Sequence, residues 1–192
     1  MTYVDAGSFS KSLLVPGQAY DKVIRLVGLL GRAGGTDNRS LPSQRHLSQR
    51  NLVEDRLRYV QETVSKISMH LPHGFATGLN RQFANLMDSD AWEDDDELVS
   101  PGALTAFLNT LLYTKTLRRP GIGSNGRGSI TASWTEGANR LTIECLPSGL
   151  ASLVLSRSGK NGEVERAAFS PIRPERVREV LAPFGPEVWF DH

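Results

Sequence analysis

The sequence has little of several features that define classes of protein. Its single cysteine, Cys145, excludes a fold held together by intrachain disulfides. The formal net charge is only +1, so no overall field attracts nucleic acid or a membrane surface. The most apolar stretch, residues 23–30, contains Arg25 and is far shorter than the roughly 20 residues that a membrane span needs. Because the first residues also lack the pattern of a secretory signal, we expect a cytoplasmic protein without membrane association.

What the chain does contain is enough to build a core. It has 192 residues, of which 39% are hydrophobic and 22% are charged, and a chain of this size hides roughly 70% of its surface on folding. Residues 16–30 carry apolar side chains at helical spacing, whereas residues 32–45 are rich in Gly, Ser, Pro, Asn and Arg and have little to bury. We predict a helix and a flexible basic linker in residues 1–45, followed by a single domain in residues 46–192.

Charge is distributed unevenly along the chain. Residues 1–60 hold nine Lys and Arg against five Asp and Glu, residues 61–100 hold two against eight, and residues 101–192 hold eleven against eight. These segments therefore carry +4, −6 and +3. Such alternation suits docking of one segment on another, or a partner that is itself charged in patches.

The first part of the predicted domain has the apolar spacing of helices. Apolar residues recur three and four apart over residues 52–71, until Pro72 ends the pattern. Residues 75–87 repeat the spacing, so the two segments are predicted to form a helical hairpin. Ser100 is a good N-cap and Pro101 a good first residue for a third helix, which is predicted to continue to about residue 117.

After Gly128 the apolar period changes from 3.6 to 2. Apolar and polar residues alternate over residues 129–135 and 141–145, and two more strands are predicted at residues 150–156 and 164–169, with turn residues between them. Arg173 and Pro174 begin a last helix. The predicted fold class is α+β: a helical hairpin and a third helix packed on a four-stranded antiparallel meander, with a C-terminal helix.

Gly121, Gly123 and Gly126 have the spacing of a phosphate-binding glycine loop. Such a loop must follow a strand and precede a helix, so that backbone amides and the positive helix pole face the phosphate. Here the glycines follow a helix and precede a strand. The pattern therefore favours a flexible connection over a phosphate site.

Two further patterns resemble metal sites without completing one. The acidic residues 88–97 lack the glycine and the glutamate that an EF-hand loop needs at its sixth and twelfth positions. His70 and His73 have a spacing that brings ligands together on a helix, but Pro72 interrupts that helix. We therefore predict no metal site and no cofactor.

The residues do not assemble into a catalytic set. Cys145 alternates with Leu141 and Ile143 on the apolar face of a strand, where a thiol packs as a small neutral group. No G-x-S-x-G sequence is present. Glu144 and His73 are the remaining acid or base candidates, because each lies on a polar strand face or in a turn. We expect a protein that is not an enzyme.

Five short segments occur in a distinctive order. They are Trp92-Glu93-Asp94, Ser100-Pro101-Gly102-Ala103-Leu104, Arg119-Pro120-Gly121-Ile122, Gly128-Ser129-Ile130-Thr131-Ala132-Ser133-Trp134 and Leu141-Thr142-Ile143-Glu144-Cys145-Leu146-Pro147-Ser148-Gly149. This order resembles that of small uncharacterised bacterial proteins with a W-D-G-like loop, a helix and a G-x-I-x-L-x-W β-meander, over about residues 90–150. The resemblance implies a fold more than an activity. By analogy, it suggests a member of a two-gene bacterial module such as an antitoxin or an immunity factor.

Arg118, Arg119 and Arg127 flank the glycine-rich segment and are candidate contacts to a partner. A basic flexible loop can hold a phosphate backbone or an acidic protein surface. No aromatic residues are interleaved with these arginines to stack on bases, and arginines near a helix end also complement its negative pole.

Two more groups of residues are candidate partner contacts. Trp189 and Phe190, close to the end of the sequence, either pack onto the domain as a latch or present an aromatic anchor to a partner. Asp94, Asp95 and Asp96 belong to the acidic stretch, which we predict to be a solvated loop suited to a basic partner.

These observations support two functional hypotheses. The first is a bacterial protein-interaction module without enzymatic activity, an antitoxin- or immunity-like partner of a second gene product. The alternative is a nucleic-acid-binding regulator that uses Arg118, Arg119 and Arg127 together with basic residues near the start of the chain. Those basic residues are Arg25, Arg32, Arg39, Arg45 and Arg50.

Overall fold

The computed structural model describes residues 44–88, 96–159 and 163–191, with side chains from residue 51 onward. All of these residues belong to one unit, Leu41–His192. The helix predicted at residues 16–30 and nearly all of the linker predicted at residues 32–45 lie outside the described residues.

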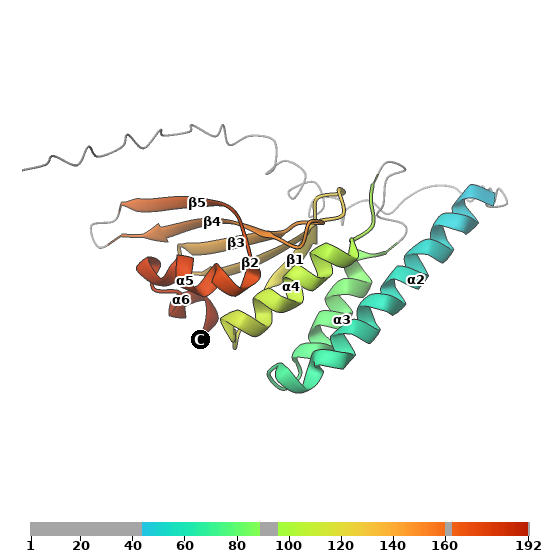
Figure 1. Ribbon diagram of the computed structural model, residues 1–192, viewed down its shortest axis with the longest axis horizontal. Coiled ribbons are helices and arrows are strands. Elements are labelled where there is room, and N and C mark those ends of the chain that lie inside the picture. The colour runs from blue at the N-terminus through green and yellow to red at the C-terminus, as the bar shows by residue number, and fades with distance from the viewer. Residues whose placement is uncertain (1–43, 89–95, 160–162, 192) are drawn as a thin grey trace, which may run out of the picture. The chain divides into compact units, whose positions relative to one another are not determined.

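The predicted helical hairpin is present. Helix α2 spans Gln44–Ile67, a 3₁₀ turn follows at Ser68–His70, and helix α3 spans Phe75–Leu86 (Figure 1). Helix α2 begins eight residues before the predicted start at residue 52, because the polar residues that precede Leu52 carry no apolar period from which a helix could be recognised. Its buried side chains face α3, whose own apolar face is also buried. These side chains are Val53, Val60 and Val64 on α2, and Phe75, Leu79 and Phe83 on α3.

Helix α4, Pro101–Thr114, begins as predicted. The Ser100 hydroxyl accepts a hydrogen bond from the Ala103 amide at 3.1 Å, and Pro101 occupies the first turn. The helix ends at Thr114, three residues before the predicted end. Lys115 takes the left-handed conformation there, with φ of 51°, and so directs the chain away from the helix axis.

The sheet has five antiparallel strands in the order β1-β2-β3-β4-β5. The strands are β1 Gly121–Ser124, β2 Ile130–Glu136, β3 Asn139–Cys145, β4 Ala151–Ser158 and β5 Val164–Ile172. The prediction of four strands was wrong, because the glycine-rich segment forms β1 and pairs with β2. Glycines show no apolar alternation, so only the pairing of Gly121 with Ser133 and of Gly123 with Thr131 identifies β1 as a strand.

The C-terminal part is a chain of short helical turns where one helix was predicted. A 3₁₀ turn at Pro174–Arg176 leads into helix α5, Val177–Leu181, and a second 3₁₀ turn, Ala182–Phe184, leads to helix α6, Glu187–Phe190. Gly185, with φ of 63°, separates α6 from the preceding turn. Pro183 lies in the turn directly after α5, where it prevents that helix from continuing, and Pro186 is the N-cap of α6.

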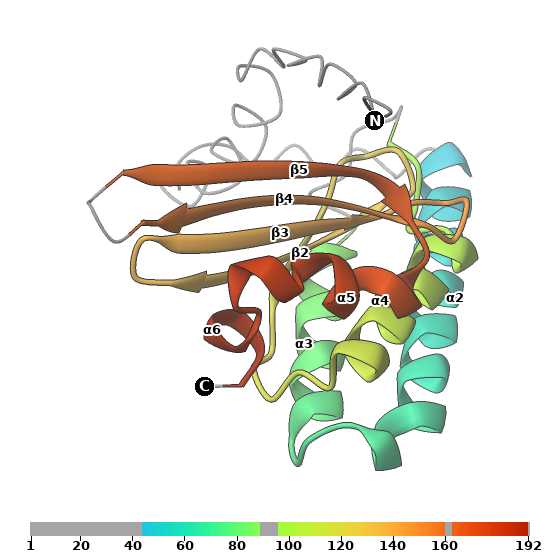
Figure 2. The same ribbon diagram turned by 60° about the vertical axis from the view of Figure 1, so that its left-hand side comes forward.

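One face of the sheet is covered by helices α4, α5 and α6 (Figures 1 and 2). Nine alternating side chains of β2, β3 and β4 point to these helices and are at most 2% exposed. These side chains are Ile130, Ala132, Trp134, Leu141, Ile143, Cys145, Ala151, Leu153 and Leu155. We call this side the covered face. The predicted alternation, and with it the α+β fold class, is confirmed.

Candidate interaction surface

The opposite side of the sheet, which we call the open face, has no helix on it among the residues that the structure describes (Figure 2). Its side chains alternate with the buried ones and are half-buried or exposed in every strand. Antiparallel sheets often expose one face to water, and that face is then available for binding. The open face is therefore the candidate interaction surface.

A row of small side chains crosses the middle of the open face. The strand registers place Gly121, Ser133, Thr142, Val154 and Ala168 side by side on five successive strands. The hydroxyls of Ser133 and Thr142 are 3.3 Å apart and share a hydrogen bond. Val154 is 55% exposed, so an apolar side chain reaches solvent near the centre of this row. The row is flat because no large side chain belongs to it.

A second row, next to the first, carries two arginines. It consists of Thr135, Arg140, Ser156 and Arg166 on strands β2 to β5. Arg140 and Arg166 are exposed and are separated by one strand, which sets their backbones about 10 Å apart. Neither arginine has an ion pair among the described residues.

The other end of the open face is held by a hydrogen-bonded turn. The Asn125 side chain donates to Glu144 Oε1 at 2.8 Å and accepts from the Arg127 amide at 2.9 Å. The Glu97 amide donates to the Gly126 carbonyl at 2.9 Å, so the segment before α4 runs beside this turn. Glu144, one of the two acid or base candidates, is thus a hydrogen-bonded residue of the open face.

Arg118, a predicted partner contact, is bound within the domain. Its guanidinium pairs with Glu136 at 2.9 Å and donates to the carbonyls of Val188 and Thr135 at 3.2 and 3.1 Å. Its own carbonyl accepts from Trp134 Nε1 at 3.0 Å. The side chain therefore joins the end of β2 to the C-terminal turns, and it does not cap α4 as one interpretation of the sequence had it.

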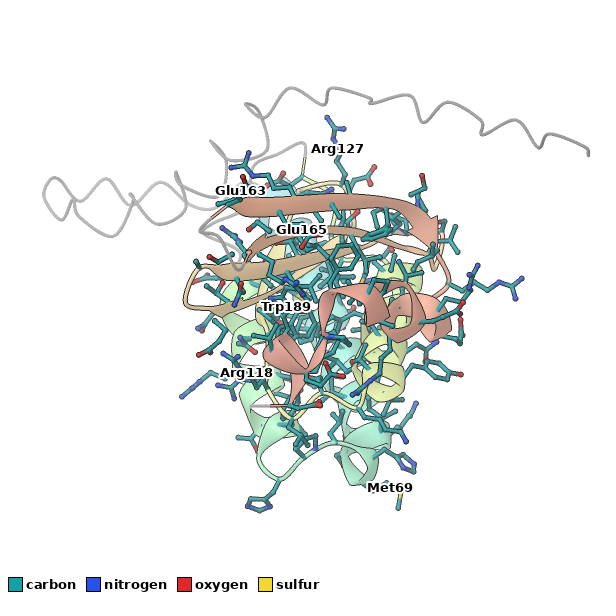
Figure 3. The ribbon with its side chains drawn as sticks, turned by 90° about the vertical axis from the view of Figure 1, so that its left-hand side faces the viewer. Met69, Arg118, Arg127, Glu163, Glu165 and Trp189 are labelled. Carbon is teal, nitrogen blue, oxygen red and sulfur yellow. The ribbon has the colours of Figure 1, made fainter. Side chains whose placement is uncertain are left out.

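Arg119 and Arg127 are both exposed, but they lie at opposite ends of β1. The Arg119 guanidinium lies over Gly78 of α3, where a β-carbon would overlap it. Figure 3 shows Arg118 and Arg127 far apart on the molecule. The structure therefore does not bring the three arginines together into one basic cluster.

Trp189 and Phe190 are fully buried on the covered face, so the latch interpretation is correct and the pair is not a surface anchor. The Phe190 ring meets Trp134 edge to face, with centroids 5.3 Å apart. The Phe190 carbonyl accepts from the Leu117 amide at 2.7 Å. Trp189 Nε1 is buried and has no hydrogen-bond partner among the described residues.

The structure describes one of the three acidic candidates, Asp96. Asp94 and Asp95 lie outside the described residues. Asp96 is half-buried, with its carboxylate next to Gly126, where a β-carbon would overlap it. Gly126 has φ of 70°, so this position suits glycine for two reasons, backbone conformation and space.

Cys145 is buried on the covered face. Burial raises the pKa of its thiol to about 12, and the nearby Glu144 charge adds to the rise while a hydrogen bond with Thr110 opposes it. Such a thiol stays protonated and is a poor nucleophile at neutral pH. His73, the other acid or base candidate, is exposed in the turn between α2 and α3, away from the sheet. Within the described parts of the chain, no group of three or more potential metal ligands is present.

Sequence reasoning missed Val154, Arg140 and Arg166. The alternation of polar and apolar residues places Arg140 and Val154 on the polar side of their strands, so that signal was present for these two. Strand β5 shows no such alternation, so no sequence signal placed Arg166 on this face. The sequence did not show that β3, β4 and β5 are neighbours in this register, which is what brings the three side chains together.

Comparisons with protein-family models, with curated proteins and with solved structures find no match to this chain. Among the described residues, no helix has the length and apolar character needed to cross a membrane. The chain is therefore not assigned to a family, and the evidence on its function comes from its own described residues.

Proposed function

We propose that this protein is an interaction module without enzymatic activity, and that it binds another protein through the open face of its sheet. The observation that carries the proposal is that, among the described residues, helices cover only one face of the sheet, while Val154 of β4 is 55% exposed on the opposite face. A flat face of small side chains admits close approach of a partner surface with little loss of side-chain entropy.

The finer assignment rests on the resemblance over residues 90–150. On that basis we propose a bacterial cytoplasmic protein that acts as an antitoxin- or immunity-like partner of a second gene product. The fold alone carries no such role, because one fold serves many functions.

A photo-cross-linking experiment tests where the partner binds. A benzophenone amino acid replaces Val154 in one version of the full chain and Ala84, an exposed residue of α3, in the control. Each version is expressed in cells of the source organism and irradiated. We expect a protein adduct from position 154 and none from position 84. Equal adducts from the two positions, or none from position 154, would refute the proposal.

The alternative, a nucleic-acid-binding regulator, has less support from the geometry. Arg118 is occupied by Glu136 and by backbone carbonyls, and Arg119 and Arg127 are separated by the length of β1. A phosphate-binding surface of the predicted kind needs these arginines on one face.

A further inference from the structure

We propose that the partner bound by the open face presents an acidic surface, with carboxylates that pair with Arg140 and Arg166 and a small apolar side chain that contacts Val154 and Ala168. This inference rests on the proposed function and names the chemistry of the partner. It is carried by the arrangement of charge on the open face.

Arg140 and Arg166 have no ion pair among the described residues, unlike the arginines that hold the domain together. Arg118 pairs with Glu136 at 2.9 Å, and Arg157 pairs with Glu165 at 3.6 Å and donates to the Phe184 carbonyl at 2.6 Å. Among the described residues, no carboxylate lies within ion-pair distance of Arg140 or Arg166. Their charges are exposed, and the structure gives them no role within the domain.

Two acidic residues of the neighbouring strands, Glu165 and Glu144, have partners other than these arginines. Glu165 precedes Arg166 in β5, but it faces the other side of the sheet, where Arg157 binds it (Figure 3). Glu144 lies on the open face, four residues from Arg140 along β3, and accepts a hydrogen bond from Asn125. Among the described residues, these carboxylates therefore leave Arg140 and Arg166 unpaired, and the row Thr135-Arg140-Ser156-Arg166 is positive.

The distance between Arg140 and Arg166 sets the spacing of the carboxylates that a partner must present. Strands β3 and β5 flank β4, so the two arginine backbones are about 10 Å apart, and Ser156 lies between them. Val154 and Ala168 are opposite one another in the adjacent row and form a small apolar contact beside the arginines. A surface with two carboxylates about this far apart, next to a small apolar side chain, complements the face in charge and in shape.

A protein partner fits these observations better than a nucleic acid does. Of the described side chains on the open face, none in the two rows is aromatic, so bases would have no stacking platform. Within the described strands, the open face carries two unpaired arginines and the carboxylate of Glu144, which make a weak site for a continuous phosphate backbone.

The decisive experiment repeats the cross-link from position 154 in charge-reversed chains. The double variant Arg140→Glu/Arg166→Glu is compared with Arg81→Glu/Arg173→Glu, which makes the same change in net charge at exposed arginines on α3 and after β5. We expect the adduct to fall at least tenfold in the first variant and less than twofold in the second. The variant Arg140→Gln/Arg166→Gln should give an intermediate loss, because it removes attraction without adding repulsion.

The outcomes separate the two proposals. If the adduct at position 154 survives Arg140→Glu/Arg166→Glu, the open face binds a partner but the partner is not acidic, and this inference fails alone. If position 154 gives no adduct in the unmodified chain, the proposed function fails. If the adduct has twice the mass of this chain, the occupant is a second copy, and the inference is overturned.

A binding measurement with defined probes distinguishes the classes of polyanion. Fluorescein-labelled poly-glutamate and a 20-nucleotide oligo-dT are titrated with the full chain at low salt, and the anisotropy is followed. We expect poly-glutamate to bind more tightly than oligo-dT, and its affinity to fall at least tenfold in Arg140→Glu/Arg166→Glu but not in the control. Tighter binding of oligo-dT, or no binding of poly-glutamate, would overturn the inference.

Discussion

The two faces of the sheet are built from the same strands but differ in burial and in residue type. On the covered face, nine side chains of β2, β3 and β4 are at most 2% exposed and contact helices that also bury Trp189 and Phe190. On the open face, the residues between them are Ser, Thr, Val, Arg and Glu, and they are half-buried or exposed. Because side chains alternate along a strand, stability and recognition can be assigned to opposite sides of one element. Matched substitutions on the two faces test whether burial, and with it the contribution to stability, is confined to the covered face.

The largest contrast is expected between Trp189→Ala and Val154→Ala. Trp189 is fully buried, so its truncation removes a large apolar contact and leaves a cavity, at a cost of about 3–5 kcal/mol in the free energy of unfolding. Val154 is 55% exposed, and its truncation should change that free energy by about 0.5 kcal/mol or less. Urea denaturation followed by far-UV circular dichroism measures both. Equal losses would show that the open face is also part of the packed structure.

The next largest contrast is expected between Gly102→Ala and Gly123→Ala. A β-carbon on Gly102 of α4 would overlap the carbonyl oxygen of Pro147, whereas one on Gly123 of β1 would meet nothing within 4 Å. We expect Gly102→Ala to lower the free energy of unfolding by about 1–3 kcal/mol, because helix and turn must separate. Gly123→Ala should be neutral, or should stabilise by up to about 1 kcal/mol through the unfolded chain. The same denaturation experiment decides, and a destabilising Gly123→Ala would contradict the uncovered geometry of that face.

The covered face could be predicted from the sequence much further than the open face. Ile130, Ala132 and Trp134 alternate with polar residues, and that pattern alone identified the strand and its buried side. Strand β1 could not be predicted in this way, because Gly121 and Gly123 have no side chains to alternate and are held in place by pairing with β2.

The sequence predicted neither which face the candidate contact Trp189 would occupy nor which residues would meet on the open face. The burial of Trp189 depends on how the C-terminal turns fold back, with the Phe190 carbonyl bonded to the Leu117 amide, and no local pattern encodes that contact. Arg140 and Arg166 become neighbours only through the register of three strands. The residues of the open face meet only when distant segments pair in the right register. The buried residues can be recognised from the alternation within each strand alone.

The two buried tryptophans on the covered face differ in one hydrogen bond, and this allows a finer test. Trp134 Nε1 donates to the Arg118 carbonyl at 3.0 Å, whereas Trp189 Nε1 has no partner among the described residues. Trp134→Phe should therefore destabilise more than Trp189→Phe, by about 1 kcal/mol, because only the first change removes a hydrogen bond. Urea midpoints of the two variants give the difference. A larger cost for Trp189→Phe would mean that its indole N–H is satisfied in solution.

The last contrast concerns the thiol of Cys145, whose effect is absent at neutral pH and appears only in alkali. Burial raises the pKa of this thiol to about 12 in the folded protein, from an ordinary value of 9.0. Between these values the unfolded chain loses the thiol proton and the folded chain retains it, so the unfolded state binds fewer protons and stability falls as pH rises. The stability advantage of the wild type over Cys145→Ala should therefore be constant below about pH 9 and shrink above it. Urea denaturation of both proteins at a series of pH values measures the difference, in which the other titrating groups cancel.

Moving the thiol to the open face provides the control for that experiment. In Val154→Cys/Cys145→Ala the sulfur replaces a side chain that is 55% exposed, where desolvation is small and the folded and unfolded pKa values should be close. Its stability relative to Cys145→Ala should then show no trend with pH above about 9. If both thiols gave the same trend, the effect would belong to the strand and not to the face on which the thiol lies. A trend confined to position 145 would confirm that adjacent faces of this sheet, separated by one backbone, differ sharply in their access to water.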